Sequence, residues 1–231
     1  MNGAHEPPGW HGKLPSLGDF ASRRLAPAFL APWDDWLATG LQQLRERNAC
    51  GWLTDYLAAP SRRFLLMPGV LPGAAGSQAW AGILMPSVDR VGRYFPFTIA
   101  QAVQPLPATV TQMQSLWFWL ARLDELAADA LQDDWSIDHL EAELARMAGP
   151  DLEALPTALG ALPQTPGTLV NLALPPRQDI GQLISIEAQS LWQQQRGGLA
   201  YWYASPDLQP PRLQVSHGLP TSAADLLGAT I

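Results

Sequence analysis

The sequence predicts an α+β or mixed α/β fold, in which helices pack against a central, mainly antiparallel sheet. Segments of helical periodicity alternate with short apolar runs, in the order helix, strands, helices, strands. Proline and glycine separate the apolar runs, as is typical of loops between strands. Of the 231 residues, 47% are hydrophobic, which is enough for a sizeable core. We therefore expect a single domain over residues 1–231, with 151–167 as the stretch where a subdivision could fall.

The first helix is expected over residues 27–47. Apolar residues recur there at steps of three and four, the spacing of one buried helix face: Leu30, Trp33, Leu37, Leu41 and Leu44. Pro32 comes early in this stretch, where its missing amide hydrogen matters least. A second, short helix is expected over residues 52–57, ahead of Pro60.

Three consecutive strands are expected next, at residues 63–67, 79–85 and 94–103. Each is a short apolar or alternating run, and proline and glycine lie between them. Because consecutive strands usually pair with one another, we expect an antiparallel arrangement with loops at both ends.

Two helices are expected after these strands. Thr109 and Gln112 have the spacing of a capping box, and the helix that follows has an apolar stripe opposite a charged one. Trp117 and Trp119 do not both fit that stripe, so at least one is expected to be exposed or covered by another element. Ser136 is expected to cap the next helix, which ends before Gly149 and Pro150.

The remaining elements are expected to be short. Residues 151–167 are rich in proline, glycine and alanine and are predicted to be a linker or a surface excursion. Four strands and a final helix are predicted after them, at residues 169–174, 183–188, 199–203, 213–215 and 223–227.

Composition excludes several classes of function. The net charge is −7 and the isoelectric point is about 4.9, whereas nucleic-acid binding requires a positive face. Cys50 is the sole cysteine, so no intrachain disulfide can form. The N-terminus has no apolar run, and prolines interrupt the longest uncharged stretch, 154–176. We expect a cytoplasmic protein with no nucleic-acid partner and no membrane insertion.

No catalytic, metal or cofactor motif is recognisable. The four histidines lack the spacing of a metal site, and there is no cysteine pair to complete one. Gly12 and Lys13 invite comparison with a phosphate-binding loop, but Pro7 and Leu14 stand where that motif has glycine and a hydroxyl residue. A phosphate- or nucleotide-binding enzyme or sensor, using this segment and nearby arginines, is the alternative function that we keep.

Two irregular segments carry most of the charged candidates. Residues 9–20, GWHGKLPSLGDF, combine glycines, a proline and both charge signs, and they read as neither a helix nor a regular strand. Residues 89–96, DRVGRYFP, form a loop that enters a strand. Loops held by a rigid sheet are frequent positions for binding residues.

These segments resemble the opening of the TagF family, whose members are type VI secretion-associated proteins. Residues 9–20 with Arg23, Arg24 and Leu25 match its GW-x-GKLPS-x-GDF…RRL signature, and residues 32–37, PWDDWL, match its PWD-x-WL helix. Residues 80–96, WAGILMPSVDRVGRYFP, match a third motif. The tail fits more loosely, since Gln193 replaces a second tryptophan.

The resemblance implies a non-catalytic accessory protein of the type VI secretion system. Members of the family repress secretion after translation and engage a forkhead-associated scaffold protein. The resemblance brings no catalytic residue and no cofactor, and the oligomeric state stays open. The candidate partner-binding residues combine polar reach with irregular backbone: Trp10, Lys13, Asp19, Arg23, Arg24, Asp89, Arg90 and Arg93.

Overall fold

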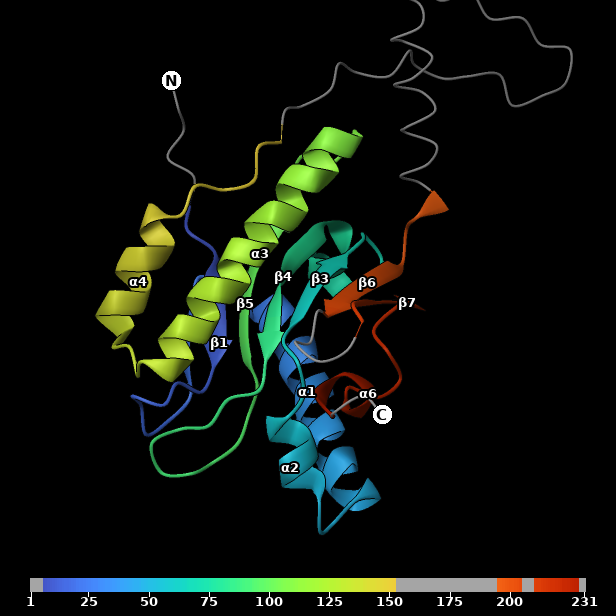
Figure 1. Ribbon diagram of the computed structural model, residues 1–231. Helices are drawn as coiled ribbons and strands as arrows, with labels where there is room; N and C mark the ends of the chain where they lie inside the picture. Colours follow the sequence, from blue (N-terminus) through green and yellow to red (C-terminus); the bar gives the residue numbers. More distant parts are fainter. Residues whose placement is uncertain (1–5, 153–194, 205–209, 229–231) are drawn as a thin grey trace, which may run out of the picture.

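The computed structural model describes residues 6–152, 195–204 and 210–228. One seven-stranded sheet lies at its centre, in the order β2-β1-β5-β4-β3-β6-β7, and every pairing is antiparallel (Figure 1). The strands are β1 (Gly9–Gly12), β2 (Ala21–Arg23), β3 (Arg62–Leu66), β4 (Ala79–Met85), β5 (Phe97–Val103), β6 (Leu199–Ala204) and β7 (Arg212–His217).

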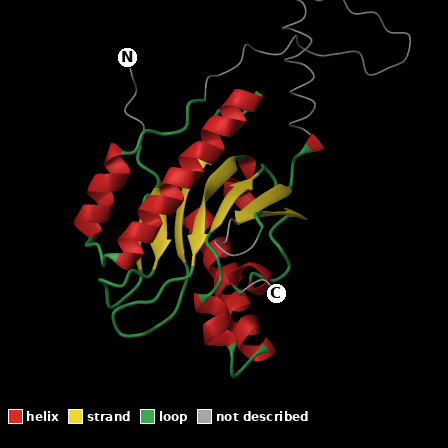
Figure 2. Cartoon of the chain, viewed as in Figure 1, coloured by secondary structure: helices red, strands yellow, loops and turns green. Residues whose placement is uncertain are grey.

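Helices cover both faces of the sheet (Figure 2). One face packs against α3 (Val110–Gln132) and α4 (Ile137–Arg146). The other packs against three helices and a 3₁₀ turn: α1 (Pro27–Arg47), α2 (Trp52–Leu57), α6 (Ala224–Leu227) and η1 (Gly73–Ser77). This arrangement of helices against an antiparallel sheet confirms the predicted fold class.

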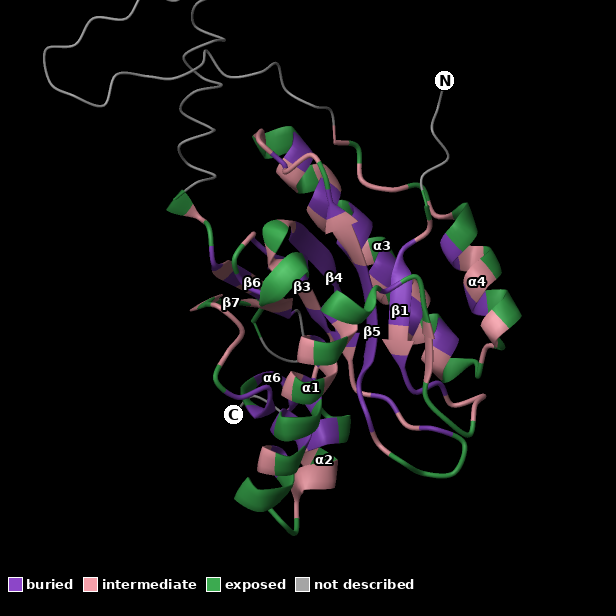
Figure 3. Cartoon of the chain, turned by 180° about the vertical axis from the view of Figure 1, so that it is seen from behind, coloured by how far each residue is buried: buried purple, intermediate pink, exposed green. Residues whose placement is uncertain are grey.

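Alternation along the central strands divides the core in two. In β3, Phe64 and Leu66 face the α1 side, whereas Leu65 faces the α3 side. In β4, Trp80 faces α1 and Ile83 faces α3. Figure 3 shows the sheet buried between layers of helices whose outer faces are exposed. Because both faces are covered, the central strands read as continuous apolar runs rather than as alternating ones.

The predicted helices are confirmed. The first and second have the expected bounds, and α1 buries Trp33, Leu37 and Leu41. The hydroxyl of Thr109 accepts a hydrogen bond from the Gln112 amide at 3.1 Å at the start of α3. The hydroxyl of Ser136 likewise caps α4. Trp119 is buried and Trp117 is only partly buried, as the conflict over the apolar stripe predicted.

The predicted strands need small corrections. β4 has its expected bounds and β3 is shifted by one residue. β5 begins at Phe97 rather than at Tyr94, because residues 94–96 complete the preceding loop. There the Phe95 amide donates to the Ser87 carbonyl, and Pro96 has no amide hydrogen to offer a neighbouring strand.

The interpretation of residues 9–20 as irregular throughout was wrong. Residues 9–12 form β1, which pairs with β5 on one side and β2 on the other. Gly12 has φ of +131°, and a Cβ atom there would lie 2.3 Å from the Pro96 carbonyl oxygen. The strand is short and glycine-rich, so it carries little apolar pattern, and its pairing with β5 is what defines it.

The C-terminal elements join the same sheet. β6 pairs with β3, β7 pairs with β6, and α6 packs against α1. Two of the predicted strands lie outside the described residues, at 169–174 and 183–188. Most of the stretch 151–167 also lies outside them. Strands from both sides of that stretch therefore share one sheet.

Candidate functional site

Two loops lie side by side at one end of the sheet, below β1 and β5 in Figure 1. They are residues 13–20, after β1, and residues 86–96, after β4. The Arg90 amide donates to the Leu17 carbonyl at 2.9 Å, and the Ser87 hydroxyl donates to the Lys13 carbonyl at 2.7 Å. These contacts join the two sequence segments that carry most of the charged candidates.

A buried ion pair holds the two loops together. Lys13 Nζ donates to Asp89 Oδ2 at 2.5 Å, and the two residues are only 2% and 3% exposed. Asp89 also accepts hydrogen bonds from the Val91 amide, and from the amide and the Nε of Arg93. Burial alone raises the pKa of Asp89, but the hydrogen bonds from Lys13, Arg93 and Val91 outweigh it and hold that pKa well below its usual range.

The outer side of this pair is exposed and charged. Arg93 reaches Asp89 Oδ2 through Nε at 2.8 Å, donates to the Gly18 carbonyl through Nη2, and lies 3.8 Å from Asp19 Oδ1. Arg90 and Asp19 are exposed. We call the exposed side chains of Asp19, Arg90 and Arg93 the loop surface.

The other candidates gather at the junction of β1, β2 and α4. Trp10 is fully buried, and its Nε1 donates to Glu141 Oε1 at 2.6 Å. Arg24, in the left-handed region with φ of 56°, forms an ion pair with the same carboxylate. Burial raises the pKa of Glu141. The hydrogen bonds from Arg24 and Trp10, together with the nearby arginine charges, outweigh that effect and hold the pKa below its usual range. Arg23 is exposed and donates to the Ser22 carbonyl.

The candidates therefore have different positions. Three of them are buried and can only support the residues at the surface: Trp10, Lys13 and Asp89. Asp19, Arg23, Arg24, Arg90 and Arg93 reach solvent to different extents. That these residues bind a partner stays a prediction, and only the second group could touch one directly.

The position of Lys13 argues against the phosphate-binding alternative. Its ammonium group faces the Asp89 carboxylate inside the protein and lies 4.3 Å from the centre of the Phe20 ring. A phosphate-binding loop presents its lysine to a ligand and leads into the N-terminus of a helix. Here the segment leads from β1 into a loop instead.

A small hollow, which the sequence did not predict, lies beside the loops. It has a volume of about 400 Å³ and is lined by His11, Phe20, Leu30 and Asp34, among others. His11 Nε2 lies 2.9 Å from Asp34 Oδ1, and the His11 ring stacks on Phe20. Phe20 is 47% exposed, and its place in the GDF motif was the signal available in the sequence.

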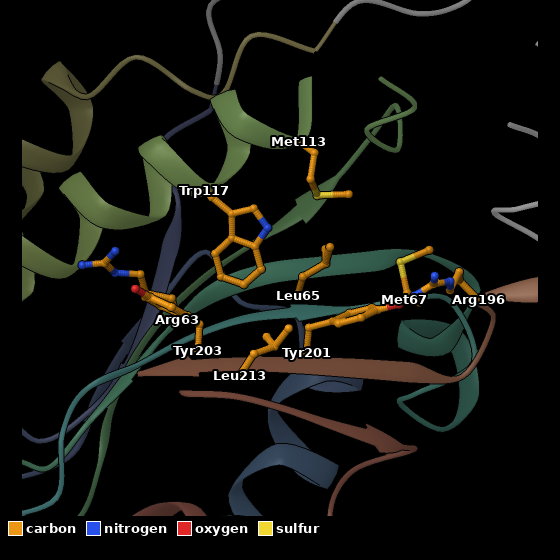
Figure 4. Close-up of a pocket in the computed structure, with 9 residues that line it drawn as sticks. All are labelled: Arg63, Leu65, Met67, Met113, Trp117, Arg196, Tyr201, Tyr203 and Leu213. Atoms are coloured by element: carbon orange, nitrogen blue, oxygen red, sulfur yellow. Dashed lines mark hydrogen bonds between the residues drawn. The ribbon is translucent and has the colours of Figure 1, made fainter. Parts of the chain in front are cut away.

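A larger groove, also missed, lies between α3 and strands β3, β6 and β7 (Figure 4). Its volume is about 600 Å³. The lining residues are Arg63, Leu65, Met67, Met113, Trp117, Arg196, Tyr201, Tyr203 and Leu213. The misfit of Trp117 to the helix stripe was the signal for this groove in the sequence.

The described residues contain neither a membrane-spanning helix nor a group of side chains suited to a metal ion. No helix among them is both long enough and apolar enough to span a bilayer. No three histidine, cysteine, aspartate or glutamate side chains in the described ranges are grouped so that they could hold a metal ion.

Comparisons with known proteins agree with the motifs. The model of the TagF N-terminal domain, described as type VI secretion system-associated, matches residues 9–147. The crystal structure of PA0076 from Pseudomonas aeruginosa PAO1 is similar, with a TM-score of 0.73 and 28% identity, over 96% of this chain and 94% of that one. No curated protein is significantly similar in sequence. With a family match over more than half of its length, the chain belongs to the TagF family of type VI secretion system-associated proteins.

Proposed function

We propose that this protein is a non-catalytic, cytoplasmic repressor of type VI secretion that acts by binding a forkhead-associated scaffold protein. Membership of the TagF family supports an accessory role in this system. The loop surface is the observation that best supports a binding role. Its charged side chains lie on two loops that the buried Lys13–Asp89 ion pair joins.

The rigidity of these loops favours binding. Lys13 and Asp89 join the loops inside the protein, and Arg93 adds a hydrogen bond across them to the Gly18 carbonyl. A surface that is already ordered loses little conformational entropy when it meets a partner. Exposed arginines are also well suited to carboxylates and phosphates, because the guanidinium group offers several donors in one plane.

Arg90 offers the cleanest test of this surface. Its side chain is exposed, whereas Arg93 also supports the loops through Asp89 and Gly18. We expect Arg90→Glu to weaken scaffold binding by roughly 10-fold or more, because it places a like charge against a complementary surface. Calorimetric titration against the scaffold protein of the same secretion gene cluster measures this, and the Tm should change little.

Arg122 provides the matched control, since it is an exposed arginine of α3, away from the two loops. Arg122→Glu makes the same charge change and should leave the affinity unchanged. Equal losses for both variants would point to long-range charge rather than to the loop surface. If the wild-type protein does not bind a folded scaffold at all, sequestration is not its mechanism, although its family membership would stand.

A further inference from the structure

The small hollow beside the loops has mostly apolar walls. Phe20 lines it from the first loop, and Pro27, Leu30 and Ala31 line it from α1. Phe20, Pro27 and Ala31 are exposed, so the hollow is open to solvent. Its volume of about 400 Å³ lies near the lower end of the range for ligand pockets, which suits one long side chain better than a large ligand.

The charged group in the hollow is the carboxylate of Asp34. His11 Nε2 lies 2.9 Å from Asp34 Oδ1. A neutral His11 that donates there orients the carboxylate and leaves its negative charge in place. Among the described residues, the other oxygen, Oδ2, has no hydrogen-bond partner. The Asp34 side chain is 45% exposed, so a ligand that enters the hollow can reach it.

The charges next to the hollow favour a cationic occupant. Asp35 follows Asp34 on α1, is exposed and forms no ion pair within the described part of the chain. The side chain of Asp19, which precedes Phe20, is 83% exposed, although Arg93 lies 3.8 Å from it. No lysine or arginine is among the described residues that line the hollow. The net charge of the whole chain, −7, has the same sign.

An arginine side chain fits this hollow better than other cations do. Its methylene groups can lie along Leu30 and Phe20 while the head group reaches Asp34. The guanidinium group stacks on aromatic rings and is more weakly hydrated than an ammonium group, so it loses less when it enters a hollow with apolar walls. Its hydrogen bonds to a carboxylate are charge-assisted and roughly twice as strong as neutral ones.

We propose that this hollow binds one arginine side chain, which the scaffold protein presents. The source of the arginine rests on the proposed function, whereas the chemistry of the hollow does not. Asp19 belongs to the loop surface and adjoins Phe20, so the hollow extends that surface toward α1. Buried arginines are frequent anchors at the centre of protein interfaces. A lysine side chain and a neutral donor such as tyrosine are the competing occupants.

Titration of the full chain with a blocked arginine tests the hollow without the scaffold. N-acetyl-arginine amide, at millimolar concentrations, should shift the NMR signals of the Leu30 and Ala31 methyl groups until they saturate. N-acetyl-citrulline amide has nearly the same shape without the charge and should not shift them. Asp34→Asn should abolish the arginine shifts. Asp35→Asn makes the same charge change on the neighbouring exposed residue and should leave them intact.

Three results of this titration would overturn the proposal. They are the absence of saturable shifts, equal shifts with N-acetyl-lysine amide, and shifts that persist in Asp34→Asn. The Tm of both variants should change little, because the Asp34 side chain is nearly half exposed and exposed ion pairs contribute little to stability.

Calorimetric titration against the scaffold separates this proposal from the proposed function. Asp34→Asn should weaken scaffold binding by at least ~10-fold, and Asp35→Asn by less than ~2-fold. Because asparagine still offers an acceptor to a neutral donor, an unchanged affinity for Asp34→Asn would overturn the arginine while scaffold binding stands. If the wild-type protein does not bind the scaffold but the blocked arginine still gives saturable shifts, the proposed function and the scaffold as the source fail, and the arginine site is upheld.

Discussion

Replacing Asp89 with asparagine should lower the Tm by about 10 °C, because breaking a buried ion pair leaves its partner charge uncompensated. The ammonium group of Lys13 would stay enclosed without a counter-ion, and the Arg93 guanidinium and the two loop amides would lose their charged acceptor. Thermal unfolding followed by circular dichroism measures the shift.

Acid should remove the same stabilisation from the wild-type protein. The folded-state pKa of Asp89 lies below its unfolded value, which is about 3.9. The stabilisation is therefore complete above about pH 4 and is lost as the pH falls toward the folded-state pKa. Asp89→Asn should accordingly lose less Tm than the wild type between pH 6 and pH 3.

Asp19→Asn is the matched control, since this residue lies on the same loops but its side chain is 83% exposed. It should change the Tm little, because exposed ion pairs contribute little to stability. A Tm for Asp89→Asn close to that of Asp19→Asn at pH 7 would show that the buried pair does not hold the loops together. The loop surface would then need another support.

The sequence predicted elements whose signal is local. α1 and α3 are long enough for their apolar stripes to repeat several times, and Thr109 and Ser136 mark helix starts through hydrogen bonds within one turn. β4 is bounded by glycine, serine and proline and is buried on both faces, so its limits were visible in the composition.

Features that depend on distant residues could not be predicted in this way. β1 exists as a strand because β5 pairs with it, and nothing within residues 9–12 indicates that partner. Lys13 and Asp89 both stood among the candidates, but their pairing joins positions 76 residues apart. The motifs indicated the candidate residues, whereas only the fold separates those that face solvent from those that are buried beneath them.

Trp33→Ala should lower the free energy of unfolding by about 3–5 kcal/mol, the usual range for removing a large buried aromatic side chain. Trp33 is fully buried where α1 crosses the sheet. Its ring contacts those of Phe29, Phe64 and Trp202, so it joins the first helix to strands β3 and β6. Denaturant unfolding measures the loss.

The indole also makes a buried hydrogen bond, which a milder substitution isolates. Trp33 Nε1 donates to the Thr98 hydroxyl at 3.0 Å, and Thr98 is fully buried in β5. Trp33→Phe keeps an aromatic ring but leaves that hydroxyl without this donor, which should add about 1–3 kcal/mol to the loss from reduced packing.

Thr98→Val in the Trp33→Phe background removes the unpaired hydroxyl and should recover part of the loss. In the wild-type background the same Thr98→Val should destabilise, because it strands the indole donor instead. If Thr98→Val has the same effect in both backgrounds, the hydrogen bond contributes nothing and the stability of this junction comes from ring packing alone.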